Sequence, residues 1–407
     1  MSRGRILHCI PGMGGGGAER QLTYLAEGLS VLGWDVHVAL ISSGPNFQRL
    51  QQTGARIHPI VASGNYDPRI AWHLGRIIKR LKPDLVQLWM LQMEVLGSLA
   101  SRWHGIPWIL SERSSEGAYP RTWKNRLRIA LTSNAAAIVA NSSDGERYWA
   151  DQPRVSAPRF VVPNALPYAE IQAATPADLG SLGFAASDRL ILFVGRLSEE
   201  KNLWALLDAF EAVVAQSDAR LAAIIGEGPL RPALHAGREA SAVASRILLP
   251  GFVGNPWSWM KRADVFVSVS RFEGHPNTVL EAAACRTPLV LSDIPAHRAI
   301  LDERSALFVS PDDPAAIAAA IQTTLAETGA AGTRAARAFM GVAELDVERI
   351  ARAYECIYEQ VLSRTDPQTR MEELHFGANQ VSAQNRSDPA ITGMPSTFPR
   401  TPKGRSR

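Results

Sequence analysis

Short apolar runs alternate with longer segments of helical period along most of the 407-residue chain. Residues 6–10 form an apolar run of strand length, and the leucines of residues 18–32 recur every three or four positions, as on one face of a helix. The same alternation restarts at residues 190–194, after a loose segment at 164–188. Alternating strands and helices predict mostly parallel, doubly wound sheets, so we expect two α/β units in series.

The other predicted elements fall on either side of the loose segment. We expect a first Rossmann-like domain at residues 1–168, a second at 169–345, and a helix at 346–363 that packs back across the domains. Residues 364–407 are rich in Pro, Ser, Thr, Gln and Arg, which predicts a disordered tail. Further strands are expected at 35–41, 85–89, 108–111, 136–140, 160–162, 222–225, 246–249, 265–269 and 288–292, and further helices at 69–81, 203–214, 278–285 and 347–362.

Composition excludes several classes of protein. Hydrophobic residues make up 46% of the chain and charged residues 20%, so a large core can form, yet no apolar run reaches the ~18 residues of a membrane span. The three cysteines are too few and too scattered for a disulfide framework or a zinc site. The excess of 43 basic over 39 acidic residues is too small to indicate a nucleic-acid partner. No signal peptide precedes the first strand, so we expect a cytoplasmic α/β enzyme.

A glycine loop at residues 12–17 follows the first strand and precedes the first helix, matching the pattern G-x-G-x-x-G. The second strand ends without the carboxylate that a nicotinamide nucleotide requires, which argues against a dehydrogenase. The loop is either a tight turn or a set of bare backbone N–H groups that receive a phosphate. We favour the phosphate, because consecutive glycines lower stability unless something must approach closely.

Two loops in the second unit carry charged side chains just beyond predicted strand ends. Arg196 and Lys201 follow Gly195 and can neutralise a diphosphate, unless they pair with neighbouring glutamates in a solvated loop. Glu273 and Glu281 stand eight residues apart, the first in a loop and the second on a helix. Two carboxylates so placed can accept hydrogen bonds from two sugar rings of one ligand, while backbone N–H groups at residues 274–277 point at a phosphate or hexose.

These two loops resemble the donor site of the retaining glycosyltransferases of family 4, which have the GT-B fold. The resemblance covers residues 5–362 and implies two Rossmann-like domains that face a central cleft. It further implies transfer of a hexose or N-acetylhexosamine from a nucleotide-diphosphate sugar, with uridine favoured, to a glycan or lipid-linked acceptor of the cell envelope, without metal or cofactor. Supporting motifs are Gly226-Glu227-Gly228-Pro229, Leu249-Pro250-Gly251, Val162-Pro163-Asn164-Ala165, Ala140-Asn141-Ser142 and Ser292-Asp293-Ile294-Pro295.

The same resemblance implies residue roles. Arg196 and Lys201 hold the diphosphate and stabilise the leaving nucleotide, Glu273 contacts the donor hexose, and Glu281 binds the ribose. The other donor-binding positions that it implies are Gly15, Gly16, Gly17, Gly195, Val253, Gly274, His275, Pro276 and Asn277.

The chain departs from the family pattern at three places. The histidine expected after the strand at 108–111 is replaced by the stretch that contains Glu112 and Arg113, so these two residues are the acceptor-side candidates. An earlier family histidine, expected near residues 85–88, is replaced by Trp89 or Met90. A glycine that is expected before Thr-Pro is Arg286, where we expect either strain from a positive φ or a further cation in the site.

A basic segment near residue 125 suggests how an acceptor is reached. Arg121, Lys124 and Arg128 share one face of a predicted helix beside Trp123. Such a face is either a solvated surface or a site for peripheral binding to anionic lipid on the inner side of the cytoplasmic membrane. Two rival functions remain: an epimerase of the same fold, for which Glu112 is the one first-domain candidate for acid–base chemistry, and a non-catalytic sugar-nucleotide-binding homologue, which the missing histidine suggests.

Overall fold

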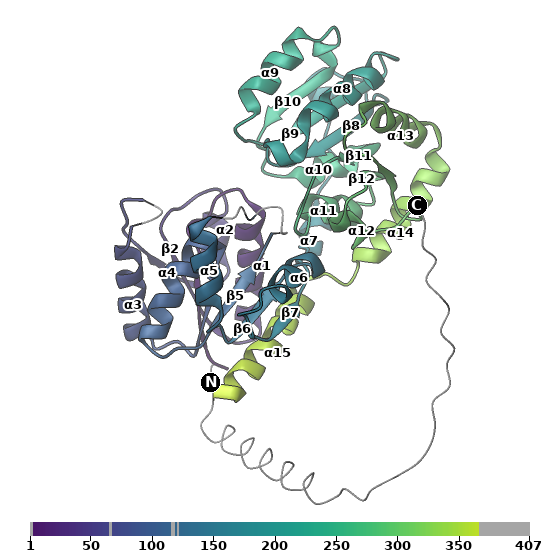
Figure 1. Cartoon of the computed structure of the whole chain (residues 1–407). Coiled ribbons are helices and arrows are strands. Elements are labelled where there is room, and N and C mark those ends of the chain that lie inside the picture. The colour runs from purple at the N-terminus through teal and green to yellow at the C-terminus, as the bar shows by residue number, and fades with distance from the viewer. Residues whose placement is uncertain (1–2, 65–66, 115–118, 120–121, 366–407) are drawn as a thin grey trace, which may run out of the picture. The chain divides into compact units, whose positions relative to one another are not determined.

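The computed structural model describes residues 3–64, 67–114, 119 and 122–365, and Met1–Val361 form one compact unit that contains two parallel sheets (Figure 1). Most of the predicted tail, residues 366–407, lies outside the described residues. We call the part built on the first sheet the N-lobe and the part built on the second sheet the C-lobe.

The N-lobe sheet has the strand order β3-β2-β1-β4-β5-β6-β7, and the C-lobe sheet has the order β10-β9-β8-β11-β12-β13. The N-lobe strands are β1 (Arg5–Cys9), β2 (Asp35–Leu40), β3 (Arg56–Pro59), β4 (Leu85–Trp89), β5 (Trp108–Glu112), β6 (Ala137–Ala140) and β7 (Arg159–Val161). The C-lobe strands are β8 (Arg189–Val194), β9 (Arg220–Ile225), β10 (Ile247–Gly251), β11 (Val265–Ser268), β12 (Leu289–Ser292) and β13 (Leu307–Val309).

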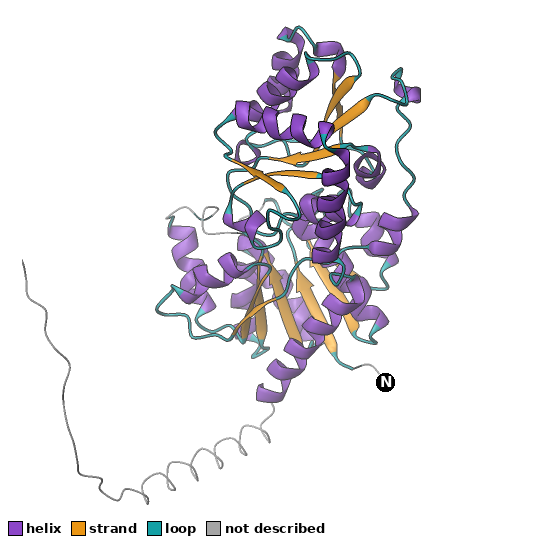
Figure 2. Ribbon diagram, turned by 90° about the vertical axis from the view of Figure 1, so that its right-hand side faces the viewer, coloured by secondary structure: helices purple, strands orange, loops and turns teal. Residues whose placement is uncertain are grey.

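Helices connect the parallel strands and cover both faces of each sheet, which confirms the predicted doubly wound GT-B class (Figure 2). The N-lobe helices are α1 (Gly17–Val31), α2 (Phe47–Gln52), α3 (Arg69–Leu81), α4 (Met90–Trp103), α5 (Trp123–Thr132) and α6 (Ser143–Ala150), followed by α7 (Tyr168–Ala173). The later helices are α8 (Leu203–Val214), α9 (Arg231–Ala240), α10 (Pro256–Arg262), α11 (Asn277–Ala284), α12 (Pro295–Arg298), α13 (Pro314–Ala326), α14 (Thr328–Val342) and α15 (Val347–Thr365). Short 3-10 turns lie at η2 (Gly180–Leu182), η3 (Glu199–Lys201) and η4 (Ala244–Arg246).

The central strands of both sheets are buried and mostly apolar, because helices cover both faces of each sheet. In β8, Leu190, Leu192 and Val194 enter one hydrophobic cluster, whereas Ile191 and Phe193 enter another. This alternation follows from the two-residue period of a strand and explains why the sequence shows an unbroken apolar run there.

The C-terminal helix α15 packs against the N-lobe (Figure 1). A Cβ on Gly28 of α1 would lie 2.5 Å from the Cβ of Ala351, so a glycine is needed at this crossing. Trp34 Nε1 donates a hydrogen bond of 3.0 Å to Glu355, and the hydroxyl of Tyr358 donates to the buried Gln87 of β4. The helix that follows the second sheet in sequence therefore returns to the first.

Two edge strands, β3 and β13, were not predicted from the sequence, because they are short and only partly buried. Arg286 has a φ of 58°, the left-handed conformation expected from the replaced glycine. Its guanidinium lies 4.2 Å from the ring centroid of Phe339, so the alternative that Arg286 is a further cation of the donor site is wrong.

Candidate functional site

The loops that follow β8 and β11 converge, because these two strands are neighbours in the C-lobe sheet. The Lys201 ammonium donates to Glu273 Oε1, and Ser270 Oγ donates to the same oxygen at 2.7 Å. Burial by itself raises the pKa of Glu273, but the charge of Lys201 and the two hydrogen bonds hold it below its usual range. The site therefore contains an ionised carboxylate beside an ammonium group, both largely shielded from solvent.

Arg196 lies exposed in the loop after β8 and acts on Glu19, the third residue of α1. Burial raises the pKa of Glu19, and the charges of Arg196 and Arg20 oppose that shift. The Glu19 carboxylate lies over the glycine loop. A Cβ on Gly14 would be 3.2 Å from a Glu19 carboxylate oxygen, and a Cβ on Gly16 would be closer still. The cation of one lobe thus faces the glycine loop of the other.

The glycines of the first loop allow close contact with the C-lobe. A Cβ on Gly17 would collide with the side-chain amide of Asn277, and one on Gly15 would lie 4.0 Å from the ring of Phe252. Phe252 precedes Val253, the position expected near the donor base, and Val253 packs partly buried on the C-lobe core. Gly195 is equally constrained, since its Cβ would lie 2.9 Å from the ring of Phe193.

His275 and Asn277 are held by the segment that links the lobes. The backbone N–H of Asn164 donates to His275 Nδ1 at 3.2 Å, and its amide donates to His275 O at 3.0 Å and to Asn277 Oδ1 at 2.8 Å. Burial and the nearby charge of Arg113 lower the pKa of His275 to about 4, so its imidazole is neutral at pH 7. Pro276 between them is buried and precedes α11.

Glu281 lies on α11 and is almost fully buried, at 2% side-chain exposure. Its Oε1 is 2.8 Å from Nη1 of Arg20, which belongs to the first turn of α1 in the N-lobe. Burial raises the pKa of Glu281, although the Arg20 charge opposes the shift. Arg20 was not predicted from the sequence, although its signal was there: a cation three residues after the last glycine of the loop, Gly17.

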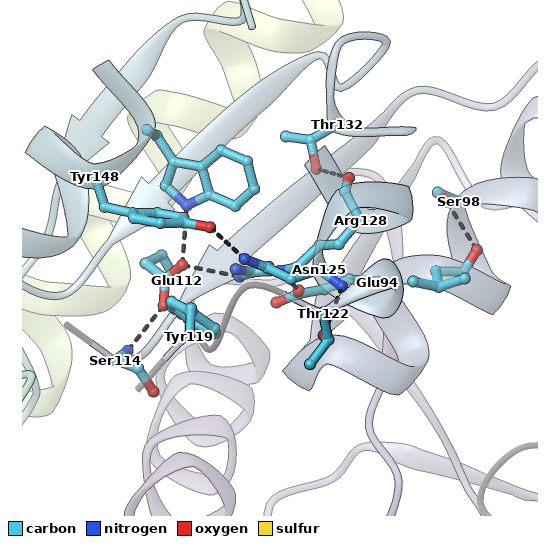
Figure 3. A network of polar contacts seen from close by, with 12 residues as sticks. Glu94, Ser98, Glu112, Ser114, Tyr119, Thr122, Asn125, Arg128, Thr132 and Tyr148 are labelled. Atoms are coloured by element: carbon cyan, nitrogen blue, oxygen red, sulfur yellow. Dashed lines mark hydrogen bonds and ion pairs between the residues drawn. The ribbon is translucent and has the colours of Figure 1, made fainter. Parts of the chain in front are cut away.

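Glu112 does not face an open cleft, which corrects the expectation that it contacts an acceptor. It is fully buried and accepts hydrogen bonds from the Ser114 N–H, Tyr119 Oη, Arg128 Nη2 and Trp149 Nε1 (Figure 3). Both carboxylate oxygens are therefore occupied by the N-lobe itself.

Arg128 forms the centre of this buried network and is 1% exposed. It pairs with Glu94 through Nε and with Glu112 through Nη2, and its guanidinium packs on the rings of Tyr119 and Trp149 (Figure 3). The prediction that Arg128 lies on a membrane-facing surface is wrong, because two buried carboxylates draw it into the core.

The other residues of the predicted membrane-binding face are Trp123, Lys124 and Arg121. Trp123 is 69% exposed, and Lys124 Nζ lies 6.0 Å from the centroid of its ring. Arg121 lies outside the described residues. Among the residues that the structure describes, no helix is both long and apolar enough to span a bilayer.

The Arg113 side chain connects the strand β4, the segment between the lobes and the helix α15. Its guanidinium donates to Asn164 Oδ1 at 3.1 Å and to the Tyr354 hydroxyl of α15 at 2.5 Å, and it stacks on Trp89 at 4.4 Å. A Cβ on Gly274 would lie 2.8 Å from the Arg113 carbonyl oxygen. The end of β5 therefore rests directly on the donor loop, whereas contact of Arg113 with an acceptor stays a prediction.

Each lobe matches a known family of protein domains. A family model described as "Glycosyl transferases group 1" matches residues 188–327, and one described as "Glycosyl transferase 4-like domain" matches residues 16–165. Within the described residues, no group of three or more His, Cys, Asp or Glu side chains is arranged to hold a metal ion.

Similar proteins include enzymes of bacterial glycan assembly. The N-acetylgalactosamine-N,N'-diacetylbacillosaminyl-diphospho-undecaprenol 4-alpha-N-acetylgalactosaminyltransferase of Campylobacter jejuni is 32% identical over 143 residues, which are 35% of this chain and only 38% of that enzyme. The lipopolysaccharide core biosynthesis glycosyltransferase LpsD of Rhizobium meliloti is 24% identical over 75% of this chain and 84% of its own length. The crystal structure of Anabaena HepE in complex with UDP and glucose superposes with a TM-score of 0.78 at 18% identity, covering 88% of this chain and 100% of that chain.

Proposed function

We propose that this chain, which belongs to the group 1 glycosyltransferases with the GT-B fold, moves a hexose or N-acetylhexosamine from a UDP-linked donor to a lipid-linked or glycan acceptor with retention of configuration. The observation that carries the proposal is the convergence of Lys201 and Glu273 at adjacent strand ends, with Glu281 on the helix that follows. A cation and two carboxylates so placed match the three parts of a nucleotide sugar: diphosphate, hexose and ribose.

In this proposal the chemistry depends on charge placed where it develops. The bond between the anomeric carbon and the leaving phosphate oxygen breaks, the acceptor oxygen bonds to the same face of that carbon, and the acceptor proton passes to the phosphate. Lys201 and Arg196 stabilise the leaving diphosphate, so no metal ion is required. When the donor binds, the Lys201 ammonium leaves Glu273 and pairs with the diphosphate. The Glu273 carboxylate can then accept a hydrogen bond from a hexose hydroxyl.

The burial of Glu112 weighs against the two alternatives to this mechanism. A double displacement needs a carboxylate nucleophile beneath the sugar. An epimerase needs acid–base groups in the cleft. Glu112 was the first-domain candidate for such acid–base chemistry, and both of its oxygens are already bound within the N-lobe.

We infer a lipid-linked acceptor at the inner face of the cytoplasmic membrane. The names of the Campylobacter and Rhizobium relatives place those enzymes on a diphospho-undecaprenol carrier and in lipopolysaccharide core synthesis. In this chain the described helices α3, α4 and α5 expose Trp72, Trp103 and Trp123, and their single acidic residue, Glu94, is buried. Tryptophans among cations suit the interface of an anionic bilayer. The cations on these helices that are exposed or half-buried are Arg69, Arg76, Lys79, Arg80, Arg102, Lys124 and Arg126.

A donor panel tests the proposal. Purified protein is incubated with UDP-, GDP- and ADP-linked sugars in EDTA, nucleoside diphosphate release is recorded, and the sugar is examined by NMR. Slow release from a UDP-sugar, giving free sugar of unchanged stereochemistry at the ring carbons, is expected. Conversion to an epimer would instead establish an epimerase, and tight UDP binding without turnover in the presence of extracted lipid acceptors would establish a non-catalytic homologue.

A further inference from the structure

The ion pair between Arg20 and Glu281 connects the two lobes beside the donor site. Arg20 lies in the first turn of α1, three residues after the last glycine of the loop, and Glu281 lies on the C-lobe helix that follows the donor loop. The carboxylate is 2% exposed and the guanidinium 22%, so the pair is shielded from water. Shielding strengthens the pair, but it also makes any unsatisfied polar atom in it costly.

One carboxylate oxygen of Glu281 is such an atom. Oε1 faces Arg20, whereas Oε2 is buried and without a partner at full hydrogen-bonding geometry among the described residues; the Trp257 indole N–H, which also lacks a partner, lies close enough to lower the pKa of Glu281. A buried carboxylate oxygen without a donor needs an explanation, and a bound ligand that donates to it is one. The missing partner must donate hydrogen bonds, and a hydroxyl of a sugar ring is a donor of that kind.

Contact between the lobes does not depend on Arg20, because the next residue supplies it. Gln21 Nε2 donates to Asn277 Oδ1 at 3.1 Å and to Ala165 O at 2.9 Å, while its Oε1 accepts the Ala165 N–H at 2.7 Å. These hydrogen bonds already fix α1 against the start of α11. A purely structural role for Arg20 would therefore duplicate one that Gln21 fulfils.

The geometry points to a different role: we propose that Arg20 is a positioning residue of the ribose site, which holds Oε1 of Glu281 and thereby turns the carboxylate so that Oε2 is left for a ribose hydroxyl. This inference rests on the proposed function, in which Glu281 binds the donor ribose. The ribose site is then assembled from both lobes, and nucleotide is bound best when α1 lies against α11.

The surroundings of Glu281 leave Arg20 as the cation that acts on it. Burial raises the pKa of Glu281, and Arg20 is the charge that opposes this shift. Tyr24 of α1 and Cys285 after α11 are neutral neighbours whose own pKa values are raised by burial. Lys261 of α10 donates to the carbonyl oxygens of Gln172 and Ala174, and Glu170 of α7 pairs with Arg49. On α14, the charged residues are Arg334 and Arg337.

Two ligands that differ only at the ribose test this role by calorimetry. UDP and 2′,3′-dideoxy-UDP are titrated into the wild-type protein, Arg20→Gln, Arg20→Lys and Glu281→Gln, with Arg147→Gln on the surface of α6 as a matched control. We expect Arg20→Gln to weaken UDP about tenfold and to change dideoxy-UDP less than twofold, as a loss of one charge-assisted hydrogen bond predicts. Arg20→Lys restores most of the UDP affinity.

Four results would overturn the inference, and they differ in whether they also overturn the ribose assignment or the proposed function. An equal loss for both ligands in Arg20→Gln would assign Arg20 a structural role only, and an unchanged UDP affinity would assign it none. If Glu281→Gln also binds UDP normally while the donor panel shows turnover, glycosyl transfer stands and the ribose assignment falls. If the wild-type protein binds neither ligand, the proposed function fails as well.

Discussion

Two buried carboxylates in this molecule meet an arginine in opposite ways. Glu112 in the N-lobe accepts four hydrogen bonds, and its partner Arg128 is shared with a second carboxylate, Glu94. Glu281 in the C-lobe has one arginine and an oxygen without a partner. Both oxygens of Glu112 are thus bound within the N-lobe, whereas Oε2 of Glu281 is not bound; Nη1 of Arg128 also has no partner among the described residues. Burial and charge alone therefore do not mark a carboxylate as part of a binding site, because both carboxylates are buried beside an arginine.

The contrast also shows what a sequence can and cannot specify. Lys201 and Glu273 could be assigned to one site, because each follows a strand and parallel strands end at the same edge of a sheet. Arg128 could not be assigned to the core, since its partners Glu94 and Glu112 lie 34 and 16 residues away and its own neighbours are basic.

The contacts between the lobes could not be predicted from the sequence either. Gln21, Asn164 and Arg20 meet the donor loop only after two sheets have folded and docked, and no local period or spacing encodes that docking. The resemblance to family 4 supplied the motif that contains Asn164, but not its hydrogen bonds to His275 and Asn277.

Removing Arg128 would break the closed network most severely. Arg128→Met leaves Glu94 and Glu112 buried without their cation, and we expect a loss of about 3–5 kcal/mol in the free energy of unfolding. Calorimetry of thermal unfolding measures this against Arg147→Gln, a surface arginine whose pair contributes little. An unchanged melting temperature would show that the network is not the core element described here.

Lys201→Ala addresses the donor site, where we expect a large loss of turnover with little loss of stability. Deleting a cation aimed at the leaving phosphate costs about 10²–10³-fold in kcat. Release of UDP under saturating donor measures the effect, with circular dichroism to show that the variant is folded. A folded variant with normal turnover would remove Lys201 from the mechanism.

Glu281→Gln sharpens the contrast between the two carboxylates. Because we propose that Glu281 Oε2 accepts a hydrogen bond from a ribose hydroxyl, we expect the variant to bind UDP about tenfold more weakly, in line with ~1.5–3 kcal/mol for a hydrogen bond to a charged group. The variant Glu112→Gln, assayed below its melting temperature, should bind UDP like the wild-type protein. An equal loss of UDP affinity in the two variants would show that the two carboxylates do not differ in their role toward UDP.

The smallest effect concerns pH and Glu94. Burial, with a further contribution from the charge of Glu112, raises the pKa of Glu94 to about 7 in the folded protein, against 4.5 as its ordinary value. A raised folded-state pKa stabilises the protein below about pH 4.5, and this contribution is lost as the pH rises through about 7. Denaturant titrations between pH 5 and pH 8 should therefore show less loss of stability for Glu94→Gln than for the wild-type protein. Parallel pH profiles would contradict the assignment.

The central claim, that the C-lobe loops hold a nucleoside diphosphate without a metal ion, is tested most directly by titrating UDP into the wild-type protein in the presence of EDTA. We expect saturable binding of one UDP per chain. High salt should abolish this binding, because it screens the ionic contacts between the diphosphate and the cations of the site. Absence of binding by UDP, GDP and ADP alike, in a folded protein, would contradict it.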